Sequence, residues 1–93
     1  MQLEWSKRSL ADRERIFTYY WNAASQRLAD EVEQAIVDRA QAIVKLKLVY
    51  RKGQKTTREC VMRRFPFIII YRIEPAKVRV VRVLHQARNY FSQ

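Results

Sequence analysis

Apolar residues follow two different periods along the chain, and each period predicts one kind of secondary structure. In residues 2–6, Leu3 and Trp5 alternate with polar neighbours, which predicts a short strand with one buried face. From residue 7 to 23 the apolar spacing becomes helical, and Ser6 is a candidate N-cap for this helix. The apolar positions of the helix are Leu10, Phe17, Trp21 and Ala24, flanked by Ile16 and Tyr20. We expect them to form one wide face that packs on the core.

A second helix is predicted after a short connection. Ser25 is its candidate N-cap, and the helical spacing then continues as far as residue 46. The apolar positions of this helix are Leu28, Val32, Ala35, Ile36, Ile43 and Leu46. Two consecutive helices with so short a connection form an antiparallel hairpin, and its apolar stripe must be covered by the rest of the chain.

The second half of the chain has the composition of a sheet. Residues 50–57 include the only glycine and are predicted to form a basic loop. Runs of β-branched and aromatic residues follow at 58–64, 67–73 and 78–85. Glu74–Lys77 is a predicted tight turn between the last two runs. The sequence therefore predicts one α+β domain over residues 1–93, in which an N-terminal strand and a helical hairpin pack on an antiparallel β-sheet.

The predicted strands differ in how their two faces are composed. Residues 67–73 are apolar at both alternating sets of positions, as expected of a central strand. For the last strand, strict alternation places Val78, Val80, Arg82 and Leu84 on one face and Arg79, Val81, Val83 and His85 on the other. We therefore expect one side of the sheet to pack on the helices and the other to carry arginines on a surface that is available to bind a partner.

The chain has a formal net charge of +10, and the excess lies entirely in its second half. Residues 1–44 hold six Lys and Arg against seven Asp and Glu, whereas residues 45–93 hold thirteen against two. A field of this sign attracts polyanions, so nucleic acid, a ribosome, an acidic protein or an anionic membrane are candidate partners. The alternative is a basic surface that serves only solubility.

Several classes of chemistry are disfavoured by composition. Cys60 has no second cysteine to pair with, and Cys60 and His85 together cannot supply the three or four ligands of a zinc site. We therefore expect a buried thiol, no metal, no cofactor and no small-molecule substrate. The N-terminal residues lack the apolar run of a signal sequence, and no segment approaches the roughly 18–20 apolar residues of a membrane span. We expect a cytoplasmic protein that does not act at a membrane.

His85, Arg88 and Tyr90 form a cluster that could carry catalysis. A proton-transfer group, a fixed cation matched to phosphate and a phenol within six residues are the parts of a metal-free ribonuclease site. The structural alternative is that His85 satisfies a backbone group at a strand end while Tyr90 packs against the helices. Composition alone favours the structural interpretation.

Basic residues of the predicted sheet and its loop form a candidate polyanion-binding set. The set consists of Lys52, Lys55, Arg58, Arg72, Arg79, Arg82 and Arg88. Arginines interleaved with aromatic residues along strands can follow a phosphate backbone, although no nucleic-acid-binding motif accompanies them. The set predicts a polyanionic partner without naming it.

The order of the predicted elements and the sequence motifs of the C-terminal half resemble those of the RelE/ParE superfamily of toxins from bacterial type II toxin–antitoxin modules. The segments that carry the resemblance are TTRECVMRRFPFIIIYRI, residues 56–73, and VRVVRVLHQARNYF, residues 78–91. The matched positions are Arg58, Glu59, Pro66, Tyr71, Arg72, His85, Ala87 and Arg88, and Phe91 takes the place of the closing aromatic residue. The match is closest to ParE-like members; it is sharp from Thr57 to Phe91 and rests on pattern alone from Gln2 to Leu46.

The resemblance implies an activity, but two targets stay open. ParE-like toxins are associated with inhibition of DNA gyrase and have no catalytic residues in this interpretation, whereas RelE-like toxins are ribosome-dependent endonucleases that cleave mRNA. The residues of these motifs favour a ParE-like toxin that arrests growth by inhibiting gyrase. The ribosome-dependent alternative could draw on Lys52, Lys55, Arg58, His85, Arg88 and Tyr90. A non-toxic nucleic-acid-binding module is the second alternative.

The resemblance also implies a protein partner. Members of the superfamily are held inactive by a cognate antitoxin, whose acidic segment folds on the toxin as a helix across the hairpin and as an added strand at the sheet edge. The positive half of the chain would speed that encounter, and exposed apolar positions on the hairpin would hold the partner. We expect Phe17, Tyr20 and Trp21 to be among those positions.

Overall fold

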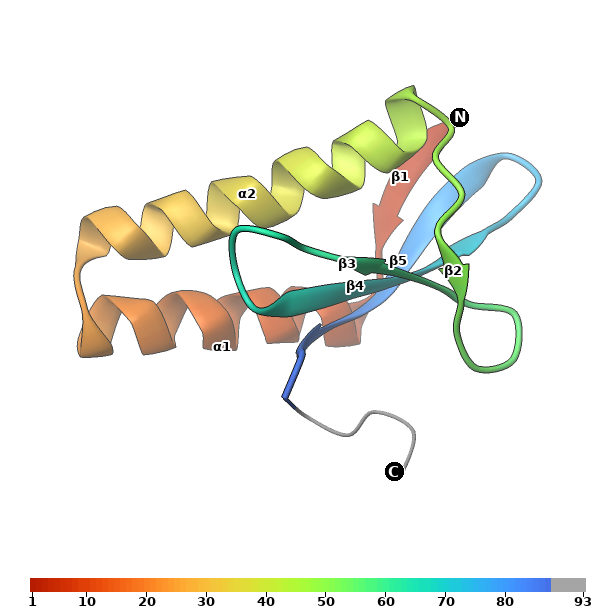
Figure 1. Ribbon diagram of the computed structural model, residues 1–93. Helices are drawn as coiled ribbons and strands as arrows, with labels where there is room; N and C mark the ends of the chain where they lie inside the picture. The colour runs from red at the N-terminus through yellow and green to blue at the C-terminus, as the bar shows by residue number, and fades with distance from the viewer. Residues whose placement is uncertain (88–93) are drawn as a thin grey trace.

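The computed structural model describes residues 1–87, and Figure 1 shows a helical hairpin beside a curved sheet. The elements in chain order are β1 (Gln2–Trp5), α1 (Lys7–Ala23), α2 (Gln26–Lys45), β2 (Arg51–Lys52), β3 (Arg58–Val61), β4 (Phe67–Ile73) and β5 (Lys77–His85). This is the predicted α+β order. Two differences are local: a two-residue strand forms within the predicted basic loop, and β3 ends at Val61 and not at residue 64.

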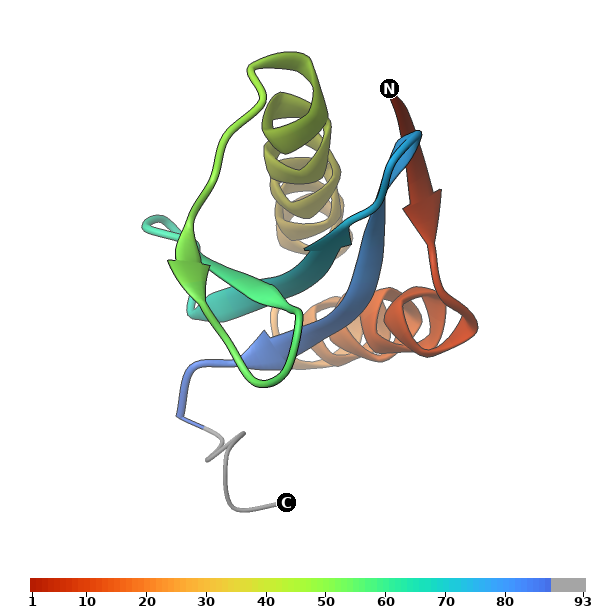
Figure 2. The same cartoon turned by 90° about the vertical axis from the view of Figure 1, so that its right-hand side faces the viewer.

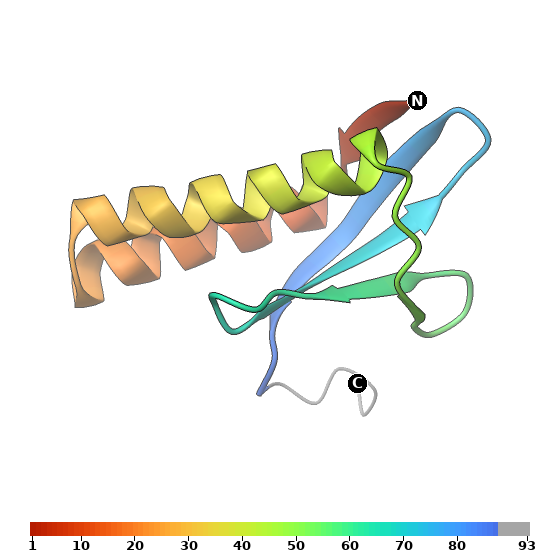
Figure 3. The ribbon, with the colours of Figure 1, turned by 45° about the horizontal axis from the view of Figure 1, so that its top comes forward.

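The five strands form one sheet in the order β1-β5-β4-β3-β2. The meander from β2 to β5 is antiparallel, as predicted, and β1 adds parallel to β5 at the edge, so the sheet is mixed. Seen along the helices in Figure 2, the sheet curves from β1 on one side to β2 on the other. In Figure 3 the turn that joins the two helices points away from the sheet. The far end of the hairpin therefore has no strand beneath it.

Both predicted helix caps are present. The Ser6 hydroxyl oxygen accepts from the Ser9 backbone N–H at 3.0 Å, and that of Ser25 accepts from the Leu28 N–H at 3.1 Å. The Ser6 hydroxyl also donates to the Val81 carbonyl at 2.8 Å, which joins the start of α1 to β5. The first helix is thus anchored to the sheet edge at its N-terminus.

The main core lies between α2 and the helix-facing side of the sheet. It is formed by Val32, Ile36, Ala40, Ile43, Cys60, Met62, Phe67, Ile69, Tyr71, Val78, Val80 and Val83. The predicted apolar stripe of α2 is largely buried there, but Leu46 follows the helix as its C-cap residue and is 63% exposed. Cys60 is buried, as expected, and burial raises the pKa of its thiol above the ordinary value.

The prediction of the core-facing side of α1 is wrong for Leu10 and Trp21, whereas its flanking residues Ile16 and Tyr20 do pack on the core. Ser9 and Asp12 are buried and Ile16 and Tyr20 are partly buried, whereas Leu10 and Trp21 are 48% and 46% exposed. The reason lies in the sheet edge: β1 ends at Trp5 beside Val80, and beyond that point β5 pairs with β4 on one side only, so in the described part of the chain its other edge has no strand beside it. The side chains of Asp12 in α1 and of its N-cap residue Ser6 occupy that edge and satisfy the Val83 N–H and the Val81 carbonyl.

The expected alternation along β5 is also wrong, because a β-bulge interrupts it. Ile70 pairs with Arg82 while Tyr71 pairs with Val80, which leaves Val81 as the extra residue. Beyond the bulge every side chain is on the opposite face from the expected one. Val83 therefore joins Val78 and Val80 on the helix-facing side, whereas Leu84 packs with Ile68, Ile70 and Val81 on the other side.

The loop between β2 and β3 depends on its glycine for space. A Cβ atom on Gly53 would lie 2.7 Å from the Thr57 hydroxyl oxygen and 3.0 Å from Glu59 Cγ. Both neighbours are buried. The glycine therefore permits a close approach of the loop to β3 that any side chain would block.

Among residues 1–87, no helix is long and apolar enough to cross a membrane.

Candidate partner-binding surfaces

An apolar strip lies on the outer flank of α1, away from the core. Leu10, Phe17 and Trp21 share one side of the helix because they are seven and four residues apart. The Phe17 and Trp21 rings contact each other with centroids 5.6 Å apart. We call these three residues the outer α1 strip. Leu10 and Trp21 are exposed and Phe17 is partly buried between them. Exposed apolar patches of this kind mark interaction surfaces in soluble proteins.

An ion pair between the two helices lies beside the outer α1 strip. The Arg13 guanidinium donates to both carboxylate oxygens of Glu33, at 3.1 and 2.8 Å, and also stacks 4.3 Å from the centroid of the Trp5 ring. Arg13 and Glu33 line a shallow hollow of about 410 Å³ with Leu10 and Phe17. The outer α1 strip is therefore carried on a rigid hairpin.

Tyr20, the third residue predicted to contact an antitoxin, faces a different direction from Phe17 and Trp21. It is partly buried and its ring meets Phe67 edge-on at 6.2 Å. Burial raises the pKa of the Tyr20 phenol, and the neighbouring Tyr19 acts in the same direction. The structure thus divides the predicted set between the outer strip and the core side of α1.

The predicted polyanion-binding residues also fall into two groups. Lys52 and Lys55 are exposed and form no ion pair with any residue in 1–87. Arg58 donates to the Tyr50 carbonyl at 3.4 Å, and Arg72 donates to the Thr56 hydroxyl at 2.9 Å. These four cations surround the β2–β3 loop without a carboxylate partner in the described part of the chain.

The other two described members of the set are paired with acids of the first half. Arg79 and Lys77 both contact Glu4, and the hydrogen bond from Lys77, assisted by the charge of both cations, lowers the pKa of that carboxyl. Arg82 is only 13% exposed and donates two hydrogen bonds to Asp12. Arg79 and Arg82 thus serve mainly to join β5 to β1 and α1. Arg88 lies outside the described residues.

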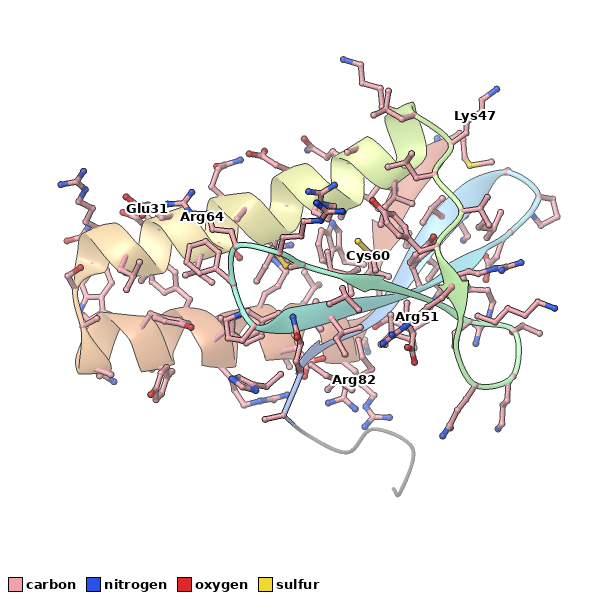
Figure 4. The ribbon with its side chains drawn as sticks, viewed as in Figure 1. Glu31, Lys47, Arg51, Cys60, Arg64 and Arg82 are labelled. Carbon is pink, nitrogen blue, oxygen red and sulfur yellow. The ribbon has the colours of Figure 1, made fainter. Side chains whose placement is uncertain are left out.

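Glu59, matched to the Arg-Glu strand of the superfamily, is buried beneath β2. Its Oε1 accepts from the exposed Arg51 side chain at 2.9 Å, and Figure 4 shows Arg51 beside the edge of the sheet. Glu59 Oε2 has no hydrogen-bond partner in residues 1–87. The pair holds the two-residue β2 against β3.

Tyr71, also matched to the superfamily, has a structural role in this chain. Its hydroxyl accepts from the Tyr50 backbone N–H at 3.0 Å and donates to the Leu48 carbonyl at 3.2 Å. Burial raises the pKa of this phenol. Tyr71 therefore fixes the segment between α2 and β2 to the centre of the sheet.

His85 is the one member of the predicted ribonuclease cluster within the described residues. It is exposed at the end of β5, its ring meets Phe67 edge-on at 5.6 Å, and its Nδ1 accepts from the Ala87 backbone N–H at 3.0 Å. Arg88 and Tyr90 lie outside the described residues. No group of three or more His, Cys, Asp or Glu in residues 1–87 could hold a metal ion.

Asp12 was not predicted as a site residue, yet it is the centre of a buried polar cluster. Its carboxylate accepts from the Val83 backbone N–H at 2.9 Å, from the Arg82 guanidinium at 2.8 and 3.0 Å, and from Arg15. The side chain is 2% exposed. One signal was available: Ser9, Asp12, Ile16 and Tyr20 follow helical spacing, so a polar pair could have been placed on the buried face.

Comparison with known proteins agrees with this architecture. No curated protein sequence matches the chain. Among solved structures, a chain of the chromosomal ParDE toxin–antitoxin system from P. aeruginosa superimposes with a TM-score of 0.82 at 22% identity, covering 91% of this chain and 95% of that one. The family model of the ParE toxin of type II toxin–antitoxin systems matches residues 3–90. The match spans the strand, the hairpin and the meander, and the chain therefore belongs to the ParE toxin family of type II toxin–antitoxin systems.

Proposed function

We propose that this chain is a growth-arresting toxin that inhibits DNA gyrase in the cytoplasm and is neutralised by a cognate antitoxin with an acidic segment. The target is contacted through the cations around the β2–β3 loop, which are the exposed Lys52 and Lys55 and the partly buried Arg58 and Arg72. No catalytic residue is required. Family membership supports the toxin assignment, and the arrangement of the sheet supports the choice of a binding mechanism over RNA cleavage.

The observation that carries this choice is the separation of His85 from the cations. His85 pairs with Phe67 at the start of β4, whereas Arg58 pairs with Tyr71 near its end. The next residue of β4 after Tyr71 is Arg72, another of the loop cations. Arg72 is five residues from Phe67, the partner of His85, which corresponds to about 17 Å along the strand. A general acid or base must lie within hydrogen-bonding reach of the group that it serves. His85 and the loop cations therefore do not converge on one phosphate.

The antitoxin is proposed to lie along the hairpin. The outer α1 strip offers an apolar helix-docking surface that runs along α1 from Leu10, near the sheet, towards the end of the hairpin that has no strand beneath it. The formal charge of +10 favours an acidic partner and would speed the encounter. Phe17 and Trp21 would contact the antitoxin directly, and Tyr20 would support them from the core side.

Growth arrest in cells separates the proposed mechanism from RNA cleavage. The wild type and His85→Ala are induced without antitoxin, and ribosome-associated mRNA is examined for new 5′ ends. We expect both proteins to arrest growth without generating such ends. Loss of arrest in a folded His85→Ala protein, together with cleavage by the wild type, would replace the proposal with the ribonuclease alternative. Normal growth with folded wild-type protein would favour a non-toxic module.

A further inference from the structure

A second cavity separates α1 from the end of β5, on the opposite flank of the helix from the outer α1 strip. Its volume is about 420 Å³. The apolar lining residues are Ile16, Phe67, Val83 and Leu84, and the polar ones are Asp12, Arg15, Tyr19, Tyr20 and His85. We call this cavity the α1–β5 pocket. Its size and its mixture of aliphatic, aromatic and few charged groups are those of a ligand site.

The pocket walls form a chain of aromatic rings. Tyr19 meets Tyr20 edge-on at 5.3 Å, Tyr20 meets Phe67, and Phe67 meets His85. The two ends of this chain, Tyr19 and His85, are exposed, and Tyr19 is 64% exposed. Such edge-to-face series hold each ring in place, so the walls are preorganised. An apolar side chain entering the pocket would displace water from an apolar floor without rearranging these rings.

The Asp12 carboxylate at the pocket binds one guanidinium from the pocket wall and one from β5. One carboxylate, Asp12, faces two guanidinium groups, those of Arg15 and Arg82. Arg82 is 13% exposed and binds both Asp12 oxygens, whereas Arg15 is 64% exposed and contacts one of them. Figure 4 shows Arg82 at the lower end of β5. Arg15 is thus the solvent-facing guanidinium of the pocket, and within residues 1–87 a single Asp12 oxygen accepts from it.

We propose that the α1–β5 pocket binds an apolar side chain of the antitoxin that has a carboxylate beside it, and that Arg15 pairs with this carboxylate. This inference rests on the proposed function, since the acidic segment is taken to be that of the antitoxin. Charge complementarity selects this occupant: the floor takes leucine or an aromatic ring, and the exposed Arg15 guanidinium takes the acid.

Arg15 can change partners without leaving a buried group unsatisfied. If it turns from Asp12 to an incoming carboxylate, Asp12 still accepts two hydrogen bonds from Arg82 and one from the Val83 N–H. The exchange therefore replaces one charge pair by another at the surface and adds the burial of an apolar side chain. Arg82 could not exchange in this way, because its removal would leave a buried carboxylate with less compensation.

Affinity for the antitoxin tests this inference with matched variants. Arg15→Gln and Tyr19→Ala are compared with Arg27→Gln, which removes a charge from a 90% exposed helix position that pairs with Glu31. The probe is the purified product of the reading frame beside the toxin gene, measured by calorimetry. We expect each pocket variant to weaken binding by about tenfold and Arg27→Gln to change it less than about twofold. Arg15→Gln should also reduce the dependence of affinity on salt.

Methyl NMR provides a measurement that does not depend on the antitoxin. Acetyl-Leu-Glu-amide at millimolar concentration should shift the methyl signals of Leu84 and Ile16 in the wild type, and acetyl-Leu-Gln-amide should shift them less. The full antitoxin should shift the same signals. In Arg15→Gln the two dipeptides should become equivalent.

The outcomes distinguish failure of the pocket from failure of the proposed function. If the antitoxin binds the wild type and both pocket variants equally, and the Leu84 methyl signals do not move, the pocket assignment is overturned while the toxin–antitoxin function stands. If the dipeptide shifts these signals but the antitoxin does not bind, the partner assignment and the proposed neutralisation both fail. Shifts caused by a single-stranded oligonucleotide and not by the antitoxin would overturn the inference in favour of a nucleic-acid subsite.

Discussion

Replacement of Asp12 by alanine is the sharpest test of how α1 is attached to the sheet. The carboxylate is 2% exposed and accepts hydrogen bonds from Arg82, Arg15 and the Val83 N–H. In Asp12→Ala the mostly buried Arg82 guanidinium loses its two hydrogen bonds to the carboxylate, and the Val83 N–H loses its acceptor. Breaking a buried ion pair in this way costs about 3–5 kcal/mol.

This cost is a large part of the stability of a domain of this size, which is about 5–15 kcal/mol. Since 1 kcal/mol shifts the melting temperature of such a domain by about 4–8 °C, Asp12→Ala should lower it by at least about 12 °C. The assay is urea and thermal unfolding followed by far-UV circular dichroism on toxin separated from its antitoxin. The matched control is Asp30→Ala on α2, an exposed acid with no ion pair among residues 1–87.

A double-mutant cycle then asks whether the loss comes from the pair. Removing both partners in Asp12→Ala/Arg82→Ala should destabilise the fold by at least about 1 kcal/mol less than the sum of the single changes, because no uncompensated charge is left. We expect Asp30→Ala to change stability by about 0.5 kcal/mol or less. An Asp12→Ala protein within 1 kcal/mol of the wild type would refute the role assigned to this carboxylate.

Three further predictions concern separate parts of the fold. Gly53→Ala should destabilise the protein by about 1–3 kcal/mol in urea unfolding, because its Cβ would lie 2.7 Å from the Thr57 hydroxyl oxygen; a neutral change would contradict the close approach. Trp21→Ala should weaken antitoxin binding by about tenfold in calorimetry while stability changes by less than about 1 kcal/mol, and the opposite pattern would place Trp21 in the core. Burial raises the folded-state pKa of Cys60, so the unfolded chain loses its thiol proton first as pH rises. Stability should therefore fall as the pH rises above the ordinary thiol pKa of 9.0, and Cys60→Ala should remove part of that slope in urea titrations; an identical slope would contradict the raised pKa.

The order and type of the elements could be predicted from the sequence because the signals are local. Ser6 and Ser25 precede helical spacing and both cap their helices. The run at 67–73 is apolar at both alternating sets and forms the central β4. Each of these predictions needs only residues within a few positions of one another.

The orientation of the faces could not be predicted, because it depends on contacts between distant parts of the chain. One extra residue at Val81 reverses every later side chain of β5, and nothing in the local composition marks it. Likewise, helical spacing identifies Leu10 and Trp21 as apolar positions but does not say whether the core or a partner covers them. The orientation of α1 is set by the unpaired edge of β5, about 70 residues further along the chain.

The candidate surface was predicted only in outline for the same reason. The sequence gives the number of cations but not their partners. Arg79 and Arg82 pair with Glu4 and Asp12 of the first half, while Lys52 and Lys55 stay exposed at the β2–β3 loop. Pairing across more than 60 residues of sequence decides which positive charges are available to a target.

The direct test of the account is gyrase supercoiling in the presence of the purified toxin. Lys52→Gln/Lys55→Gln removes two exposed loop charges, and Lys7→Gln/Arg8→Gln removes two from the exposed start of α1. The account predicts that the wild type, His85→Ala and the α1 variant inhibit supercoiling alike, whereas the loop variant requires at least about tenfold more protein. Undiminished supercoiling at a large excess of folded wild-type toxin, or equal inhibition by the loop and α1 variants, would contradict it.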